Sequence, residues 1–110
     1  MAKDDYFVVV YRILTYLYAC FKAGERPDTD MFGPEALGIS NGYWVNVMES
    51  IFNEEYIIGV TFRTPIGGMR GIKIFDLRIT QKGIEFLQEN SLMAKARDFL
   101  KTMKETIPGI

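Results

Sequence analysis

Apolar residues near the start of the chain recur every three or four positions. They are Tyr6, Val9, Val10, Ile13, Leu14, Leu17, Tyr18 and Phe21. This period is typical of an amphipathic helix and predicts one over about residues 5–23, with Asp4 or Asp5 at its start and Gly24 at its end. Residues 25–33 are mainly polar and predict a loop, with a short extended piece around Met31 and Phe32.

A second helical pattern is interrupted by a turn within residues 34–55. A short helix over 34–37 ends at Gly38, because glycine adopts the left-handed conformation that closes a helix without steric cost. Ser40 can cap the next helix, whose apolar positions are Trp44, Val47, Met48 and Ile51. The pattern predicts a helix-turn-helix over about residues 34–55, with Trp44 in the core.

Alternation at every second residue replaces the helical period after residue 56. The alternation places Ile58, Val60 and Phe62 on one face of the first strand, and Phe75, Leu77 and Ile79 on one face of the next. Residues 64–71 contain three glycines and a proline, which is typical of a turn. The pattern predicts a β-hairpin over about residues 57–79.

Helical spacing returns at the end of the chain. It predicts helices over about residues 81–90 and 92–105, capped by Thr80 and Ser91. The whole order predicts an α+β fold in one domain over residues 1–110. This fold is a winged helix, a helix-turn-helix with a two-stranded β-hairpin wing, plus a C-terminal helix. The hairpin is needed because three short helices cannot cover their own apolar faces.

Composition narrows the class of protein. The chain has 110 residues, no histidine and a single cysteine, Cys20. Without histidine there is no serine–histidine–aspartate set, so we expect no enzyme, no metal and no cofactor, and no small-molecule substrate is evident. Cys20 lies in the first helical pattern and is expected to pack rather than react. With no basic–apolar leader and no apolar run long enough to span a membrane, the expected location is the cytoplasm, without a membrane partner.

Charge is distributed unevenly along the chain. Residues 1–60 carry four bases and nine acids, a net charge of −5, whereas residues 61–110 carry nine bases and five acids, a net charge of +4. Between residues 61 and 82 the single acid is Asp76, against five bases. The predicted hairpin is therefore basic in a chain whose total charge is −1.

Two stretches of the chain resemble the YjcQ family. They are Glu55-Tyr56-Ile57-Ile58-Gly59-Val60 and Ile79-Thr80-Gln81-Lys82-Gly83-Ile84-Glu85-Phe86-Leu87 with the four residues that follow. The resemblance covers roughly residues 5–104. It implies small winged-helix proteins of Gram-positive bacteria and their phages, with DNA binding suggested by analogy of fold alone. The long aromatic first helix and the wing rich in proline and glycine depart from a typical member.

The first hypothesis for function is binding of double-stranded DNA by a small transcription regulator. The residues expected to reach the major groove from the second helix of the motif are Ser40, Asn41, Gly42, Val45 and Asn46. Asn41 and Asn46 could bond adenine, and Val45 could contact a thymine methyl group. Tyr43 is either a phosphate-bonding hydroxyl or a core ring. Residues 40–57 contain no lysine or arginine, which weakens the hypothesis.

Basic residues of the predicted wing partly compensate for the lack of lysine and arginine in the second helix of the motif. Arg63, Arg70 and Lys73 are expected to contact phosphates or the minor groove. They could equally be solvated charges that discourage pairing of sheet edges. Ile66 and Met69 beside them are apolar, which is consistent with the second hypothesis, a winged-helix protein–protein interaction module, such as a phage accessory protein, without affinity for DNA.

An apolar stripe on the last helix raises the possibility of a homodimer. Its members are Leu92, Phe99, Leu100 and Met103. Two such stripes can pair across a two-fold axis. The alternative is that the first and last helices cover each other within one chain.

Overall fold

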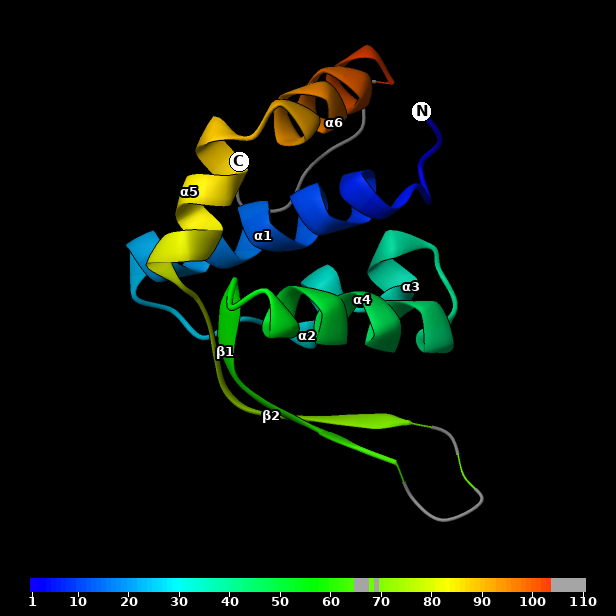
Figure 1. Cartoon of the computed structure of the whole chain (residues 1–110), viewed down its shortest axis with the longest axis vertical. Helices are drawn as coiled ribbons and strands as arrows, with labels where there is room; N and C mark the ends of the chain where they lie inside the picture. The colour runs from blue at the N-terminus through cyan, green and yellow to red at the C-terminus, as the bar shows by residue number, and fades with distance from the viewer. Residues whose placement is uncertain (65–67, 69, 104–110) are drawn as a thin grey trace.

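The structure is a computed structural model that describes residues 1–64, 68 and 70–103. Its elements in chain order are α1 (Tyr6–Ala23), α2 (Thr29–Phe32), α3 (Pro34–Leu37), α4 (Asn41–Asn53), β1 (Ile57–Arg63), β2 (Gly71–Ile79), α5 (Gln81–Glu89) and α6 (Ser91–Thr102). The fold is α+β with a winged-helix layout, as the sequence predicts. The hairpin extends away from the helices and runs beside α4 (Figure 1).

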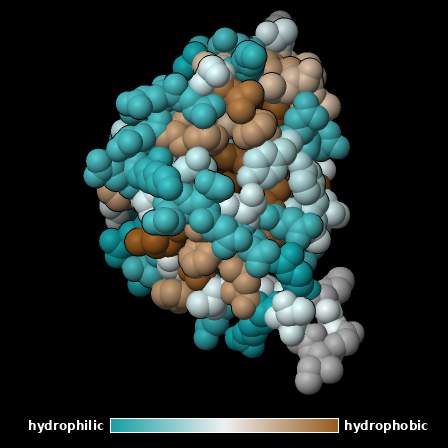
Figure 2. All heavy atoms as spheres, in the orientation of Figure 1, coloured by the Kyte–Doolittle hydropathy of each residue, from teal (hydrophilic) through white to brown (hydrophobic). Residues whose placement is uncertain are grey.

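Helix α1 is the centre of the core. It lies between α4 on one side and α5 and α6 on the other (Figure 1), and every residue from Val8 to Leu17 is buried. By length and hydropathy alone this 18-residue helix could cross a membrane. Its apolar surface is instead covered by the rest of the chain, as in the core helix of a soluble protein. Hydrophilic residues cover most of the face in Figure 2, with separate hydrophobic patches between them.

The turn of the helix-turn-helix forms as the sequence predicts. Gly38 has a φ of 69°, in the left-handed region, and its N–H donates to the Glu35 carbonyl. The Ser40 hydroxyl oxygen caps α4 by accepting from the N–H of Tyr43 at 3.2 Å. Trp44 is 4% exposed and its indole N–H donates to the Phe32 carbonyl, so it belongs to the core.

The segment before this motif is helical, and the predicted extended piece around Met31 and Phe32 is wrong. Asp28 caps α2, because its Oδ1 accepts from the N–H of Asp30 at 2.9 Å. The single turn that follows places Phe32 in the core against Tyr16. A helix of four residues is too short for its apolar positions to show a period.

An irregularity in the hairpin changes which residues face the core. The pair Ile58–Arg78 is followed by the pair Val60–Ile74, so β2 advances four residues while β1 advances two. Gly59 has a φ of 87° at this β-bulge. Ile57, Val60, Leu77 and Ile79 are buried as a result. Ile58 is 53% exposed and Phe75 is 58% exposed, so the predicted grouping of Ile58 with Val60, and of Phe75 with Leu77 and Ile79, on one face is wrong.

The start of α5 is tied to the turn between α4 and β1. Thr80 donates its hydroxyl to the Glu55 carbonyl at 2.6 Å and its N–H to the Tyr56 carbonyl at 3.0 Å. The same hydroxyl oxygen caps α5 by accepting from the N–H of Gly83. A Cβ on Gly83 would lie 2.3 Å from the Tyr56 oxygen, so this close approach requires glycine.

Helices α6 and α1 pack against each other within the chain. Leu100 is fully buried there, which contradicts its assignment to a dimer interface, and Leu92 and Phe99 are half-buried against the same core. Only Met103 of the predicted stripe is largely exposed, at 47%. Asn90, rather than Ser91, caps α6, and residues 104–105 of the predicted helix lie outside the described residues. Dimerisation itself stays a prediction.

Replacing Gly59 with alanine should destabilise the hairpin strongly. The new Cβ would lie 1.7 Å from the Asp76 carbonyl oxygen, and alanine disfavours a positive φ. We expect a loss of about 2–4 kcal/mol in the free energy of unfolding, measured by urea denaturation. Gly42→Ala is the matched control, since a Cβ there meets nothing within 4 Å and should leave stability equal or higher. Equal losses from both variants would contradict the bulge geometry.

Candidate nucleic-acid interface

The exposed side of α4 faces away from α1. It carries some of the residues that the sequence predicts to reach the major groove of DNA. Asn41, Gly42 and Asn46 are exposed, and Ser40 is exposed at the helix start. Glu49 lies one turn beyond Asn46 on the same side of the helix. These positions together form a polar surface that could enter a groove of DNA.

Val45 does not belong to this surface. It is 2% exposed and packs in the core with the neighbouring Trp44 and Met48. The apolar arc of α4 is wide enough to include both 44–45 and 47–48, so position 45 points inward. The predicted contact between Val45 and a thymine methyl group is therefore wrong.

Tyr43 has a structural role. Its hydroxyl donates to the Asp4 carbonyl at 2.7 Å and so attaches the start of the chain to α4. Burial raises the pKa of the Tyr43 hydroxyl, and the nearby carboxylates of Asp4 and Asp5 raise it further. Of the two roles that the sequence leaves open, the structure supports packing over phosphate binding.

Arg70 joins the wing to α4. Its Nη1 donates to the Asn46 Oδ1 at 3.0 Å, and its Nη2 forms an ion pair with the Glu49 carboxylate. The guanidinium therefore neutralises an acid on the exposed side of α4 and holds the hairpin beside that helix. Because Arg70 occupies the Asn46 oxygen, the amide N–H groups of Asn46 are left as its outward donors.

Arg63 and Lys73 provide the exposed positive charge of the wing. They lie on the paired strands, where Arg63 is opposite Gly71 and Lys73 is opposite Thr61. No carboxylate of the described residues forms an ion pair with either of them. Asp76, the single acid of this segment, is bound by Arg78 at 3.0 Å. Ile66 and Met69, the apolar residues predicted beside Arg70, lie outside the described residues.

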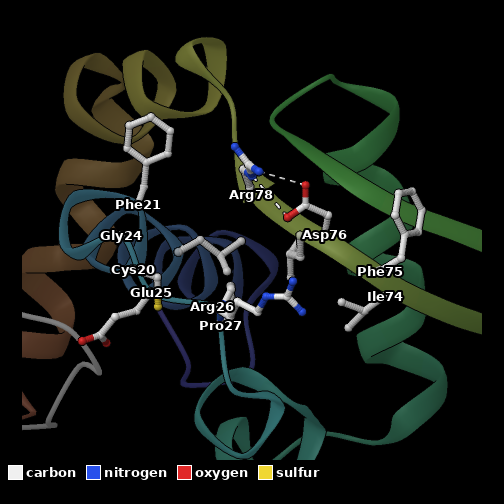
Figure 3. Close-up of a pocket in the computed structure, with 12 residues that line it drawn as sticks. Cys20, Phe21, Gly24, Glu25, Arg26, Pro27, Ile74, Phe75, Asp76 and Arg78 are labelled. Carbon is white, nitrogen blue, oxygen red and sulfur yellow. Dashed lines mark hydrogen bonds and ion pairs between the residues drawn. The ribbon is translucent and has the colours of Figure 1, made fainter.

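A separate hollow of about 620 Å³ lies between the end of α1 and β2. Figure 3 shows Phe21 at one side of it and Ile74 and Phe75 at the other. Phe21 is 53% exposed and Ile74 is 37% exposed, so large apolar side chains border this hollow. The sequence analysis missed this hollow, because strict alternation places Phe75 on the same face as Leu77 and Ile79. The glycine at position 59 within the strand was the available signal of a bulge.

Comparison with known proteins identifies a family. The family model described as YjcQ protein matches residues 11–106. No curated protein and no solved structure matches the chain.

Substituting Arg70 and Glu49, singly and together, should show that the two side chains stabilise the fold jointly. We expect a double-mutant cycle of Arg70→Met and Glu49→Gln to give a coupling free energy of about 0.5–1 kcal/mol in low salt, since both side chains are about one-third exposed and solvent screens the pair. The coupling should shrink as salt is added. Pairing Glu49→Gln with Lys95→Met, on the far helix α6, should give none. Zero coupling in the Arg70 cycle would contradict the contact.

The Tyr43 hydrogen bond should make stability depend on alkaline pH. Because the folded pKa is raised above the ordinary value near 10, the fold favours the protonated hydroxyl, and this stabilisation is lost as the pH rises through the folded pKa. Tyr43→Phe should cost about 1 kcal/mol at neutral pH. It should also lose less stability than the wild type as the pH rises beyond about 10, measured by urea unfolding. Burial also raises the pKa of Tyr16 and Tyr56, so some alkaline loss should remain. If the free energy of unfolding fell equally with pH in the wild type and in Tyr43→Phe, the prediction would be contradicted.

Proposed function

This chain belongs to the YjcQ family, and we propose that it is a winged-helix protein that binds double-stranded DNA as a small transcription regulator. The observation that carries the proposal is the contact of Arg70 with Asn46 and Glu49. It holds the basic hairpin beside the exposed side of α4. A duplex can meet a recognition helix and a wing together only when the two are held side by side.

In this proposal α4 enters the major groove and the wing follows the adjacent backbone. The Asn46 amide N–H groups and the Asn41 side chain donate to base acceptors, while Gly42 lets the backbone of α4 approach closely. Arg63 and Lys73 bind phosphates from the hairpin. Arg70 serves both parts, because its ion pair removes the repulsion that Glu49 would otherwise exert on a phosphate.

Charge predicts how strong this binding is. With at most three cations at the surface, the slope of log affinity against log salt should be about −3, much less steep than for strongly basic DNA-binding proteins. The acidic first 60 residues lower the nonspecific affinity further. We therefore expect binding to depend on sequence and to be detectable mainly at low salt. The proposed role is regulatory and not catalytic, and the proposed location is the cytoplasm.

The decisive experiment is a selection of genomic fragments by the purified protein, followed by salt titrations on the recovered duplex. Arg63→Ala with Lys73→Ala should weaken binding to every sequence alike and reduce the salt slope by about 2. Lys95→Ala with Lys101→Ala, on α6, removes the same charge and should change neither quantity. Asn46→Ala should relax preference at one base pair while leaving the salt slope unchanged. Absence of binding to any duplex at low salt would refute the proposal.

The hollow of Figure 3 favours a second candidate, a protein-interaction module. Phe21, Ile74 and Phe75 are large and exposed and border the same hollow from opposite sides, and exposed apolar side chains of this kind are common where a partner protein docks. This candidate predicts capture of a partner protein at physiological salt that Phe75→Ser abolishes, together with no affinity for DNA. A Phe75→Ser variant that binds duplex normally would assign the DNA surface and the hollow to different roles.

A further inference from the structure

The bond between Arg70 and Asn46 determines which hydrogen-bonding groups α4 presents to a base. The Arg70 Nη1 donates to the Asn46 Oδ1 at 3.0 Å, and its Nη2 forms an ion pair with the Glu49 carboxylate. Asn46 and Glu49 are three residues apart and therefore lie on the same side of α4. One planar guanidinium thus bridges both side chains and restricts the direction of each.

A guanidinium has only donors, and this fixes the orientation of the Asn46 amide. If the amide were turned over, its NH2 group would face the N–H groups of Arg70, donor against donor. The oxygen of Asn46 therefore faces Arg70, and the two amide N–H groups lie on the other side of the planar group. Because Asn46 is exposed on α4, a base that approached it would meet donors.

The adenine contact expected for Asn46 from the sequence needs both halves of this amide. Asparagine pairs with adenine when its Oδ1 accepts from the N6 amino group while its Nδ2 donates to N7. Here the Oδ1 is already bonded to a cation. An adenine amino group that approached the same oxygen would also approach the N–H groups of Arg70, so this pairing is unfavourable while Arg70 is in place.

Guanine presents the complementary edge in the major groove. Its N7 and O6 are adjacent acceptors without a donor, whereas adenine and cytosine each carry an amino donor and thymine offers one acceptor beside a methyl group. The Asn46 N–H groups can bond the guanine acceptors. The positive guanidinium behind them strengthens such bonds, because it polarises the amide.

We propose, on the basis of the DNA binding proposed above, that Arg70 is a positioning residue that makes Asn46 select guanine. Arg70 acts through the Asn46 oxygen, and Glu49 holds the guanidinium from its other side. The base read from this part of α4 is therefore guanine instead of adenine.

The test is a set of affinity measurements on the selected duplex with all four base pairs placed in turn at one position. That position is the one at which Asn46→Ala relaxes preference. We expect the wild type to bind a G·C pair there, in one of its two orientations, at least about fivefold more tightly than an A·T pair in either orientation.

A double variant separates the orientation of the amide from charge. Glu49→Gln with Arg70→Met removes one acid and one base, so the net charge stays that of the wild type, and it frees the Asn46 oxygen. Both side chains are about one-third exposed, so the substituted chain should fold. Preference at the same position should change from guanine to adenine, because Asn46 can then accept and donate together.

Glu49→Gln alone is the matched control. It keeps the bond between Arg70 and Asn46, so the preference for guanine should remain. A hairpin that had only lost its attachment to α4 would relax the preference in the double variant, and a reversal toward adenine requires the freed oxygen.

Four results would overturn this assignment while DNA binding stands. They are a wild-type preference for any base other than guanine, a double variant that keeps the guanine preference or merely relaxes it, loss of that preference in Glu49→Gln alone, and no position at which Asn46→Ala relaxes preference. Absence of binding to every duplex at low salt would instead refute the proposed function and this assignment together.

Discussion

The close approach of α5 to the turn between α4 and β1 is the constraint on which the arrangement of the wing depends. Gly83 packs against the Tyr56 carbonyl, and Thr80 bonds both Glu55 and Tyr56. Both ends of the hairpin are thereby fixed at the base of α4. Thr80 and Gly83 belong to one of the stretches that resemble the YjcQ family. That stretch is informative because it fixes where the hairpin leaves the helices.

The wing is held at a second point farther out. The bulge at Gly59 lets β2 take two extra residues, and beyond it Arg70 bonds Asn46 and Glu49 on α4. A hairpin anchored at its base and near its tip keeps a defined orientation to α4. Because the hairpin is already ordered, little conformational entropy would be lost when it binds a ligand. A surface with few cations could therefore still have measurable affinity for DNA.

Sequence reasoning predicted the elements well, because nearly every boundary carries its own residue signal. Gly38 ends α3, and Ser40 and Thr80 cap α4 and α5, as their residue types predict. The site was less predictable. Val45, Ile58 and Phe75 were misplaced, because their orientation depends on a wide helix arc and a bulge rather than on a period. The ion pair of Arg70 with Glu49 joins residues that are 21 positions apart, and a contact between such distant residues cannot be predicted from periodicity along the chain.

If α4 and the wing form one DNA-binding surface, amide NMR shifts followed during titration with a selected duplex should report both parts at once. Shifts at Asn41, Gly42 and Asn46 and at Arg63 and Lys73 should then change together, with one affinity, while α6 is unaffected. Shifts confined to the hollow between α1 and β2, or changes in the wing without changes in α4, would contradict it.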